Sequence, residues 1–229
     1  MEPSVPALLT RLAALALCVS MTAVKAQDAP QTLITNVHVF DGVGEQRIEN
    51  ANVLIEGNLI KTASMDPIEA AGATVIDGGG RTLMPGLIDA HWHTMYIGTP
   101  LEALANGDMV EVAARAVPKA EAVLMRGFTT VRDMGGAAKS LKTIIDEGVV
   151  PGPRILPSGP PISQTSELLE LSGPRHPYHE GPLGVIAEGA YAELILLDGN
   201  LLEDLDLVAD PDANFDLIMT DGVIYKNTL

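Results

Sequence analysis

The sequence predicts a mixed fold, α/β with β, in which β-rich segments from both ends of the chain flank a central stretch of βα units. Short β-rich runs separated by turn residues occupy residues 31–85, and the same character returns from residue 184. Between them, strand-like runs alternate with helical stretches, which is the pattern of a parallel sheet. The predicted order along the chain is therefore sheet, βα units, sheet.

The first 26 residues are predicted to be a secretory signal outside the fold. Arg11 precedes an apolar run over residues 12–24, and small residues in Val24-Lys25-Ala26 mark a cleavage point. The run is shorter than the roughly 20 residues that span a bilayer, although a retained membrane anchor is the alternative. Cys18 is the one cysteine, so removal of the signal leaves no thiol. We expect a secreted or periplasmic protein that needs no disulfide.

The chain is strongly acidic, with a formal net charge of −16. Binding to nucleic acid or to an anionic membrane surface needs a basic patch that displaces counterions. We therefore expect no nucleic-acid partner and, once the signal is removed, no membrane partner.

The expected elements follow from turn residues and periodicity. The N-terminal strands are residues 32–40, 51–56, 59–61 and 73–77, the last of them closed by Gly78-Gly79-Gly80. The central part has strands at 87–91, 128–133 and 154–159, with helices at 100–125 and 137–147. The C-terminal strands are 192–198, 215–219 and 223–225, with a hairpin turn at Thr220-Asp221-Gly222.

His91 and His93 are the candidate metal ligands. They lie two residues apart at the end of a strand, so both imidazoles point the same way while Trp92 points away. In a parallel barrel, the C-terminal ends of the strands form the catalytic face. Two imidazoles are half of a zinc site, which needs three or four protein ligands. Taken alone, a pair of this spacing is more often structural.

The residues around the pair resemble the amidohydrolase superfamily. Residues 83–93 are similar to its first barrel strand, whose motif P-G-x-x-D-x-H-x-H is highly specific. Further similar stretches are residues 36–42 and 75–78 (N-terminal strands), 127–133 and 152–165 (second and third barrel strands), and 184–194 (return into the sandwich). The phrases most resemble the imidazolonepropionase-like branch, which includes exported dipeptidases that cleave Xaa-Pro and related dipeptides.

This resemblance implies a composite β-sandwich built from both chain ends, with a (β/α) TIM-type barrel between them. In the family, the H-x-H pair binds one of two divalent metals, usually Zn²⁺. A lysine on the fourth strand, histidines on the fifth and sixth, and an aspartate ending the eighth complete the site. The implied function is hydrolysis of a C–N amide or peptide bond in a small-molecule amide or dipeptide, by water that the metals activate.

Only His91 and His93 correspond to family ligands, so no catalytic residue can be assigned. Three barrel strands are recognisable between Gly86 and Thr165, whereas a barrel needs eight. Residues 167–173 resemble the helix after the last barrel strand, which indicates an internal deletion near Ser166. We expect an incomplete barrel of about three strands, at most a partial metal site, impaired or absent activity, and self-association at the open barrel edge.

The predicted organisation therefore has four parts. They are a signal peptide (1–26), the N-terminal part of the β-sandwich (27–85), a truncated metal-dependent hydrolase barrel (86–181) and the C-terminal part of the sandwich (182–229).

Several other polar residues are candidate site residues. Asp133 ends the second barrel strand, where it either supports the metal ligands or caps the strand. His176, His179 and Glu180 could form a ligand cluster, but a Pro/Gly-rich connector with exposed histidines is the favoured interpretation. Surface or packing roles are favoured for the remaining candidates, which are His38, Lys119, Lys139 and Lys142.

Two alternatives to a metal-dependent amidohydrolase stay open. One is a non-catalytic β-sandwich remnant or binding module, and metal stoichiometry distinguishes it from the enzyme. The other is a full-length enzyme whose middle was lost in sequence assembly, which sequencing of the coding DNA across Ser166-Glu167 would reveal.

Overall fold

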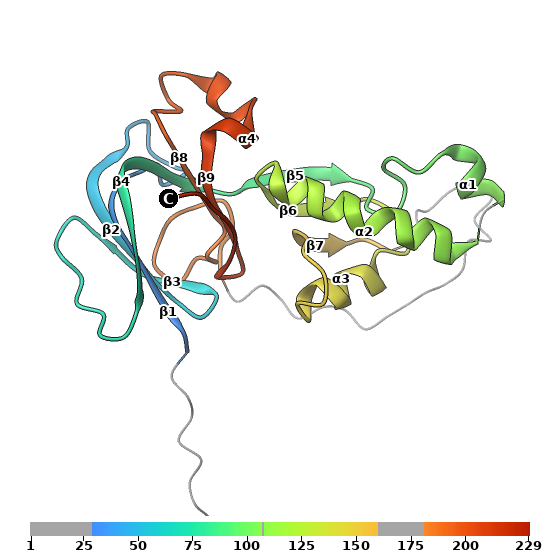
Figure 1. Cartoon of the computed structure of the whole chain (residues 1–229), viewed down its shortest axis with the longest axis horizontal. Coiled ribbons are helices and arrows are strands. Elements are labelled where there is room, and N and C mark those ends of the chain that lie inside the picture. Colours follow the sequence, from blue (N-terminus) through green and yellow to red (C-terminus); the bar gives the residue numbers. More distant parts are fainter. Residues whose placement is uncertain (1–28, 107, 160–180) are drawn as a thin grey trace, which may run out of the picture.

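The structure is a computed structural model that describes residues 29–106, 108–159 and 181–229 (Figure 1). It consists of a strongly curved β-sheet and, beside it, a smaller parallel sheet with helices packed on it. The predicted signal and the cluster of His176, His179 and Glu180 lie outside the described residues. In the described part, no helix is long and apolar enough to cross a membrane.

The curved sheet takes strands from both ends of the chain, as the sequence predicts. Its strands are β1 (Gln31–Val39), β2 (Ile48–Glu56), β3 (Leu59–Ser64), β4 (Thr74–Pro85), β8 (Leu194–Leu197), β9 (Phe215–Thr220) and β10 (Val223–Asn227). The hydrogen-bonded order is β10-β9-β8-β4-β1-β2-β3, and the β1–β4 pair is parallel. The two chain ends meet where β4 pairs with β8.

Hydrogen bonding joins these strands into one sheet, whereas the sequence predicts the two facing layers of a sandwich. The sheet curves until its β3 edge reaches the segment before β8. There, Leu59 forms a β-bridge with Tyr191, and the Ile60 N–H donates to the Ala190 carbonyl at 2.7 Å. The long strand β4 makes this possible because it pairs with β1 along most of its length and with β8 at its C-terminal end.

The glycine run at 78–80 does not end a strand, so that prediction is wrong. Strand β4 continues through it, and its register against β1 shifts there, because Thr35 pairs with Asp77 but Val37 pairs with Arg81. Gly79 and Gly80 have φ values of 61° and 78°, a backbone conformation that glycine adopts without steric cost. The run is therefore a β-bulge that bends the strand.

The smaller sheet has the order β5-β6-β7, with all neighbours parallel. Its elements are β5 (Leu87–Trp92), α1 (Leu101–Asn106), α2 (Met109–Met125), β6 (Phe128–Asp133), α3 (Lys139–Asp146) and β7 (Arg154–Pro157). These confirm the three predicted strands. The single helix expected at 100–125 is two helices, because the Asp108 carboxylate accepts from the Glu111 N–H at 2.8 Å and starts α2.

Between strands β8 and β9 of the curved sheet lie two short helices, η1 (Leu205–Val208) and α4 (Pro211–Asn214).

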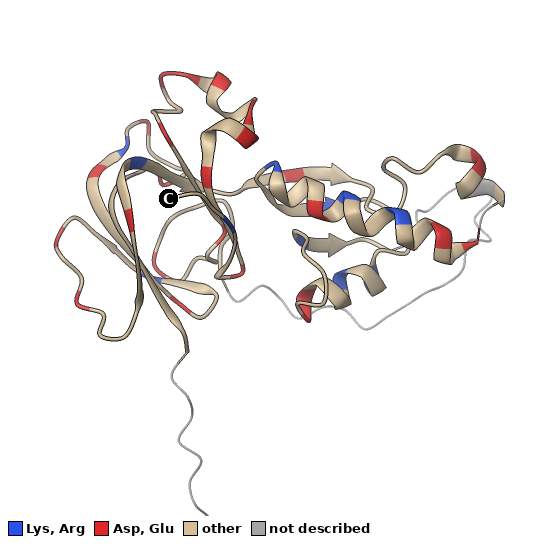
Figure 2. Ribbon diagram, in the orientation of Figure 1, with Lys and Arg blue, Asp and Glu red and all other residues tan. Residues whose placement is uncertain are grey.

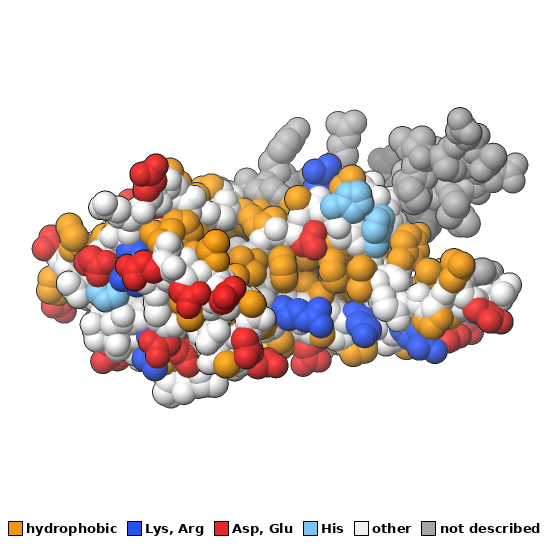
Figure 3. Space-filling model, turned by 90° about the horizontal axis from the view of Figure 1, so that it is seen from above, with side chains coloured by type: hydrophobic (Ala, Val, Ile, Leu, Met, Phe, Trp, Pro, Cys, Tyr) orange, Lys and Arg blue, Asp and Glu red, His pale blue; other side chains and the backbone are white. Residues whose placement is uncertain are grey.

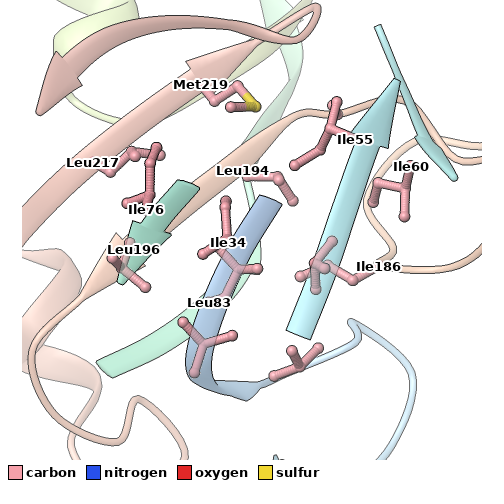
Figure 4. Close-up of a cluster of buried hydrophobic side chains, with 14 of the residues drawn as sticks. Ile34, Ile55, Ile60, Ile76, Leu83, Ile186, Leu194, Leu196, Leu217 and Met219 are labelled. Atoms are coloured by element: carbon pink, nitrogen blue, oxygen red, sulfur yellow. The ribbon is translucent and has the colours of Figure 1, made fainter. Parts of the chain in front are cut away.

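Three hydrophobic clusters lie within and between the curved sheet and the parallel sheet. The curved sheet encloses a cluster of its own, which Figure 4 shows with side chains such as Ile34, Leu194 and Leu217 pointing toward one another. A second cluster lies between the parallel sheet and α2 and α3. A third cluster joins the two sheets; its buried members are Met84, Leu124, Ile195, Leu197, Leu201, Phe215 and Ile218.

A buried ion pair fixes the same junction. Arg154, at the start of β7, donates from Nε to Glu193 Oε1 at 2.9 Å and also pairs with Asp221. Glu193 precedes β8 and accepts a second hydrogen bond from the Thr220 hydroxyl. The side chains of Arg154 and Glu193 are only 15% and 3% exposed. Burial disfavours a charged group far more than a neutral one. The hydrogen bonds of this pair offset part of that cost and hold the two side chains in place.

The ionisation of Glu193 gives a testable pH dependence. Burial raises the pKa of Glu193, and the opposing effect of Arg154 is smaller. The folded chain therefore holds this proton at pH values where the unfolded chain has released it. The free energy of unfolding should fall as the pH rises from about 4.3, the ordinary pKa of glutamate, through the raised value. Glu193→Gln lacks this titration, so denaturant unfolding at several pH values should show wild type losing stability relative to the variant. Parallel curves would contradict the assignment.

Candidate metal centre

The carboxyl ends of β5, β6 and β7 lie at one edge of the parallel sheet, and both predicted metal ligands are at that edge. His91 is the last residue but one of strand β5, and His93 is the first residue after the strand. His91 is exposed and His93 is half-buried. Figure 3 shows histidine side chains at the surface next to a stretch of hydrophobic side chains. The structure therefore brings the two imidazoles together in a position that solvent reaches.

The spacing of the two rings suits a shared metal ion. Two imidazoles that bind one tetrahedral zinc ion at about 2.0–2.1 Å have ring centroids roughly 5 Å apart. The centroids of His91 and His93 are 5.3 Å apart, with the ring planes at 73°. The Asp89 carboxylate accepts from the His91 N–H at 2.9 Å, which fixes the backbone between the two residues of the motif. The separation of the two rings is therefore compatible with one shared divalent ion.

His93 is held from two sides. Its Nδ1 lies 3.4 Å from the Gly135 carbonyl, so the tautomer that carries a proton on Nδ1 donates there and leaves Nε2 as a ligand. The ring of Tyr96 stacks on the His93 ring, with centroids 5.8 Å apart and an angle of 26°. The carbonyl and the aromatic ring together limit the orientations of the imidazole.

Asp133, the last residue of β6, lies close to His93 and to the Gly135 segment. It is fully buried, and it pairs with Trp92 in the β5–β6 register. Its Oδ1 accepts from the Gly135 N–H at 3.3 Å, while Oδ2 has no hydrogen-bond partner among the described residues. Burial raises the pKa of Asp133, and the Gly135 and Thr94 N–H groups and His93 oppose the rise. Asp133 thus supports the Gly135 segment that faces His93, which is compatible with either predicted role.

The other sequence candidates lie elsewhere. His38 is in β1 and forms an ion pair with Glu49. Lys119 and Lys139 are exposed, and Lys142 pairs with Asp146 along α3. Across residues 29–106, 108–159 and 181–229, no group of three or more His, Cys, Asp or Glu side chains is placed to hold a metal ion. In the described chain, His91 and His93 therefore form a half-site.

Sequence reasoning missed Tyr96 and the Gly135-Gly136 segment. A β-carbon on Gly136 would lie 3.3 Å from Cζ of Tyr96, so the glycine lets the ring approach the backbone. The φ of Gly136 is 129°, which a side chain would disfavour. An aromatic residue three positions after an H-x-H pair carries no signal by itself, because its contact with the second histidine depends on the turn after β5.

We expect Tyr96→Ala to weaken Zn²⁺ binding by roughly tenfold or more. Removing a group that orients a metal ligand typically lowers metal affinity by this amount. Tyr96→Phe keeps the stacked ring and should bind as wild type does. Isothermal titration with Zn²⁺ checks both variants. Equal affinities for wild type and Tyr96→Ala would mean that the stacking does not position His93.

The sequence around the histidine pair is similar to known proteins. The sequence model described as "Amidohydrolase family" matches residues 82–181, which include β5, β6 and β7. Adenine deaminase 2 of Shouchella clausii is 38% identical over 63 residues, which are 27% of this chain and 11% of that protein. Imidazolonepropionase of Arthrobacter sp. is 33% identical over 91 residues, which are 38% of this chain and 23% of that protein. The matches thus span about a quarter or less of these curated relatives.

Solved structures also show similarity to amidohydrolases. The crystal structure of an amidohydrolase is 42% identical, covers 57% of this chain and 32% of its own, and superimposes with a TM-score of 0.54. A prolidase complexed with N-methylphosphonate-L-proline covers 86% of this chain and 100% of its own, with a TM-score of 0.73 at 20% identity, which shows the fold alone. Over residues 82–181, which are 100 of its 229 residues, the chain is therefore similar to the amidohydrolase family.

Proposed function

We propose that this chain carries the first half of a metal-dependent amidohydrolase site, from an enzyme that hydrolyses a C–N amide or peptide bond. The observation that carries the proposal is the placement of His91 and His93 at the carboxyl end of β5, with rings 5.3 Å apart. A divalent ion, with zinc as the expected metal, would supply a Lewis acid that polarises a carbonyl group and lowers the pKa of bound water.

The three parallel strands are, in this proposal, the first strands of an incomplete (β/α) TIM-type barrel. His91 and His93 would hold the ion, and the Gly135 carbonyl and Tyr96 would orient His93. Asp133 would keep the Gly135 segment in place by accepting a hydrogen bond from the Gly135 N–H. The half-site of the described residues supplies two ligands where a catalytic zinc site has three. We therefore propose that hydrolysis by this chain is weak or absent.

The proposed substrate class is a small-molecule amide or dipeptide. The names of the similar proteins support a C–N bond as the target, since they include an imidazolonepropionase and a 5′-deoxyadenosine deaminase. An Xaa-Pro dipeptide is the specific candidate, and the prolidase that shares the fold is the reason to test it. The N-terminal apolar segment supports a secreted or periplasmic location.

Turnover of an Xaa-Pro dipeptide by the purified chain, with and without Zn²⁺, tests this proposal. The double variant His91→Ala/His93→Ala is the control. We expect the wild type to bind Zn²⁺ and yet to hydrolyse the dipeptide no faster than the double variant. Clear zinc-dependent turnover that the double variant loses would contradict the impaired site. Wild type that binds no Zn²⁺ would contradict the half-site and favour a non-catalytic β-domain.

A further inference from the structure

We propose that a divalent ion bound by His91 and His93 joins two copies of this chain, each of which contributes one histidine pair. The inference rests on the proposed function, because it needs the pair to bind a metal. It goes further in naming a second copy of the chain as the source of the remaining ligands.

The ligand count is the first argument. A structural zinc site is almost always tetrahedral, with four protein ligands. The described residues of one chain place two imidazoles together, and no third His, Cys, Asp or Glu side chain joins them there. Two copies related by a twofold axis through the ion would present four imidazoles, since a twofold axis repeats the same residues on both sides.

The exposure of the pair is the second argument. Strand β5 is at the edge of the described parallel sheet, whose order is β5-β6-β7. His91 is exposed, and two apolar side chains near it in the sequence are also open to solvent, with Ile88 of the same strand 45% exposed and Ile97 39% exposed. Figure 3 shows hydrophobic surface next to the histidines. A second copy that meets the ion here would cover these side chains, which favours association through the hydrophobic effect.

Charge explains why the ion is needed. Each chain has a formal net charge of −16, and Figure 2 shows Asp and Glu spread over both the curved sheet and the helices. Two copies therefore repel each other, most strongly at low ionic strength. We therefore expect association to depend on coordination of the ion and to strengthen as salt screens the repulsion.

Sedimentation equilibrium of the purified chain, with EDTA or with Zn²⁺, measures the association. We expect a monomer in EDTA and a dimer with half a zinc ion per chain in Zn²⁺, with excess EDTA restoring the monomer. His91→Ala and His93→Ala should stay monomeric in Zn²⁺. His38→Ala is the matched control and should dimerise, because His38 lies in β1 of the curved sheet.

The outcomes separate this inference from the proposed function. A monomer that binds one zinc ion per chain would overturn the dimer and leave the half-site standing. A chain that binds no zinc would overturn both. A dimer that persists in EDTA would show that the ion is not the link. If the histidine variants fail to fold, as circular dichroism would reveal, the reversal of wild-type dimerisation by EDTA still decides the question.

Discussion

Replacing Arg154 by alanine is expected to lower the free energy of unfolding by about 3–5 kcal/mol, the usual cost of breaking a buried ion pair from one side. The guanidinium group contacts Glu193 and Asp221 and lies over the ring of Tyr191, 4.0 Å from its centroid. At pH values where Glu193 is ionised, loss of the guanidinium group would leave a buried carboxylate without a cation. Because Arg154 comes from β7 and its partners Glu193 and Asp221 adjoin strands β8 and β9 of the curved sheet, the loss also loosens the junction. Urea unfolding measures the effect.

Arg132→Ala is the control for this experiment, because Arg132 is an exposed arginine of the same sheet. Its substitution should change stability by no more than about 0.5 kcal/mol. Arg154→Lys should fall between the two, since an ammonium group cannot reproduce the planar donor geometry. Equal stabilities of Arg154→Ala and Arg132→Ala would show that the buried pair does not hold the two sheets together.

Phe215→Ala is expected to cost about 3–5 kcal/mol, the range for a large aromatic side chain removed from a core. Phe215 is 1% exposed and belongs to the cluster that joins the two sheets. A β-carbon on Gly127 would lie 2.6 Å from its Cε2, so the ring packs directly on the backbone before β6. The cavity would open between the sheets. Thermal unfolding, followed by circular dichroism and by Trp92 fluorescence, measures the loss.

Trp92 lies in the parallel sheet, so its fluorescence reports on that part while circular dichroism reports on the whole chain. In the Phe215→Ala variant, the two transitions should separate, with Trp92 responding at the lower temperature. Leu205→Ala, at a side chain that is 70% exposed, should leave both unchanged. Coincident, unshifted transitions in Phe215→Ala would show that the sheets are not joined through this cluster.

The elements that the sequence predicted well are those whose signals are local. The strands of the small sheet and the turn at Thr220-Asp221-Gly222 follow from periodicity and turn residues within a few positions. The glycine run at 78–80 was misassigned because the same residues suit a turn or a bulge, and only the pairing of β4 with β1 decides between them. Closure into one sheet depends on the distant contact between Leu59 and Tyr191.

In the candidate site too, local signals could be predicted from the sequence and distant contacts could not. Alternation along a strand places His91 and His93 on one face, so the pair could be found without the structure. The carbonyl of Gly135 is 42 residues from His93, and its approach depends on how β6 lies beside β5. The contact of Tyr96 depends on the backbone of the turn after β5. Long-range register and loop conformation are not encoded in any short pattern, and these supply the supports of the half-site.

A Zn²⁺ titration followed by NMR of the histidine ring nitrogens tests whether His91 and His93 bind the same ion, because each imidazole reports its own ligation. If the two imidazoles share one ion, one nitrogen in each of His91 and His93 shifts on binding, both saturate together, and His38 does not respond. Saturation without any shift at His91 and His93, or a shift at only one of them, would contradict a shared metal half-site at the end of β5.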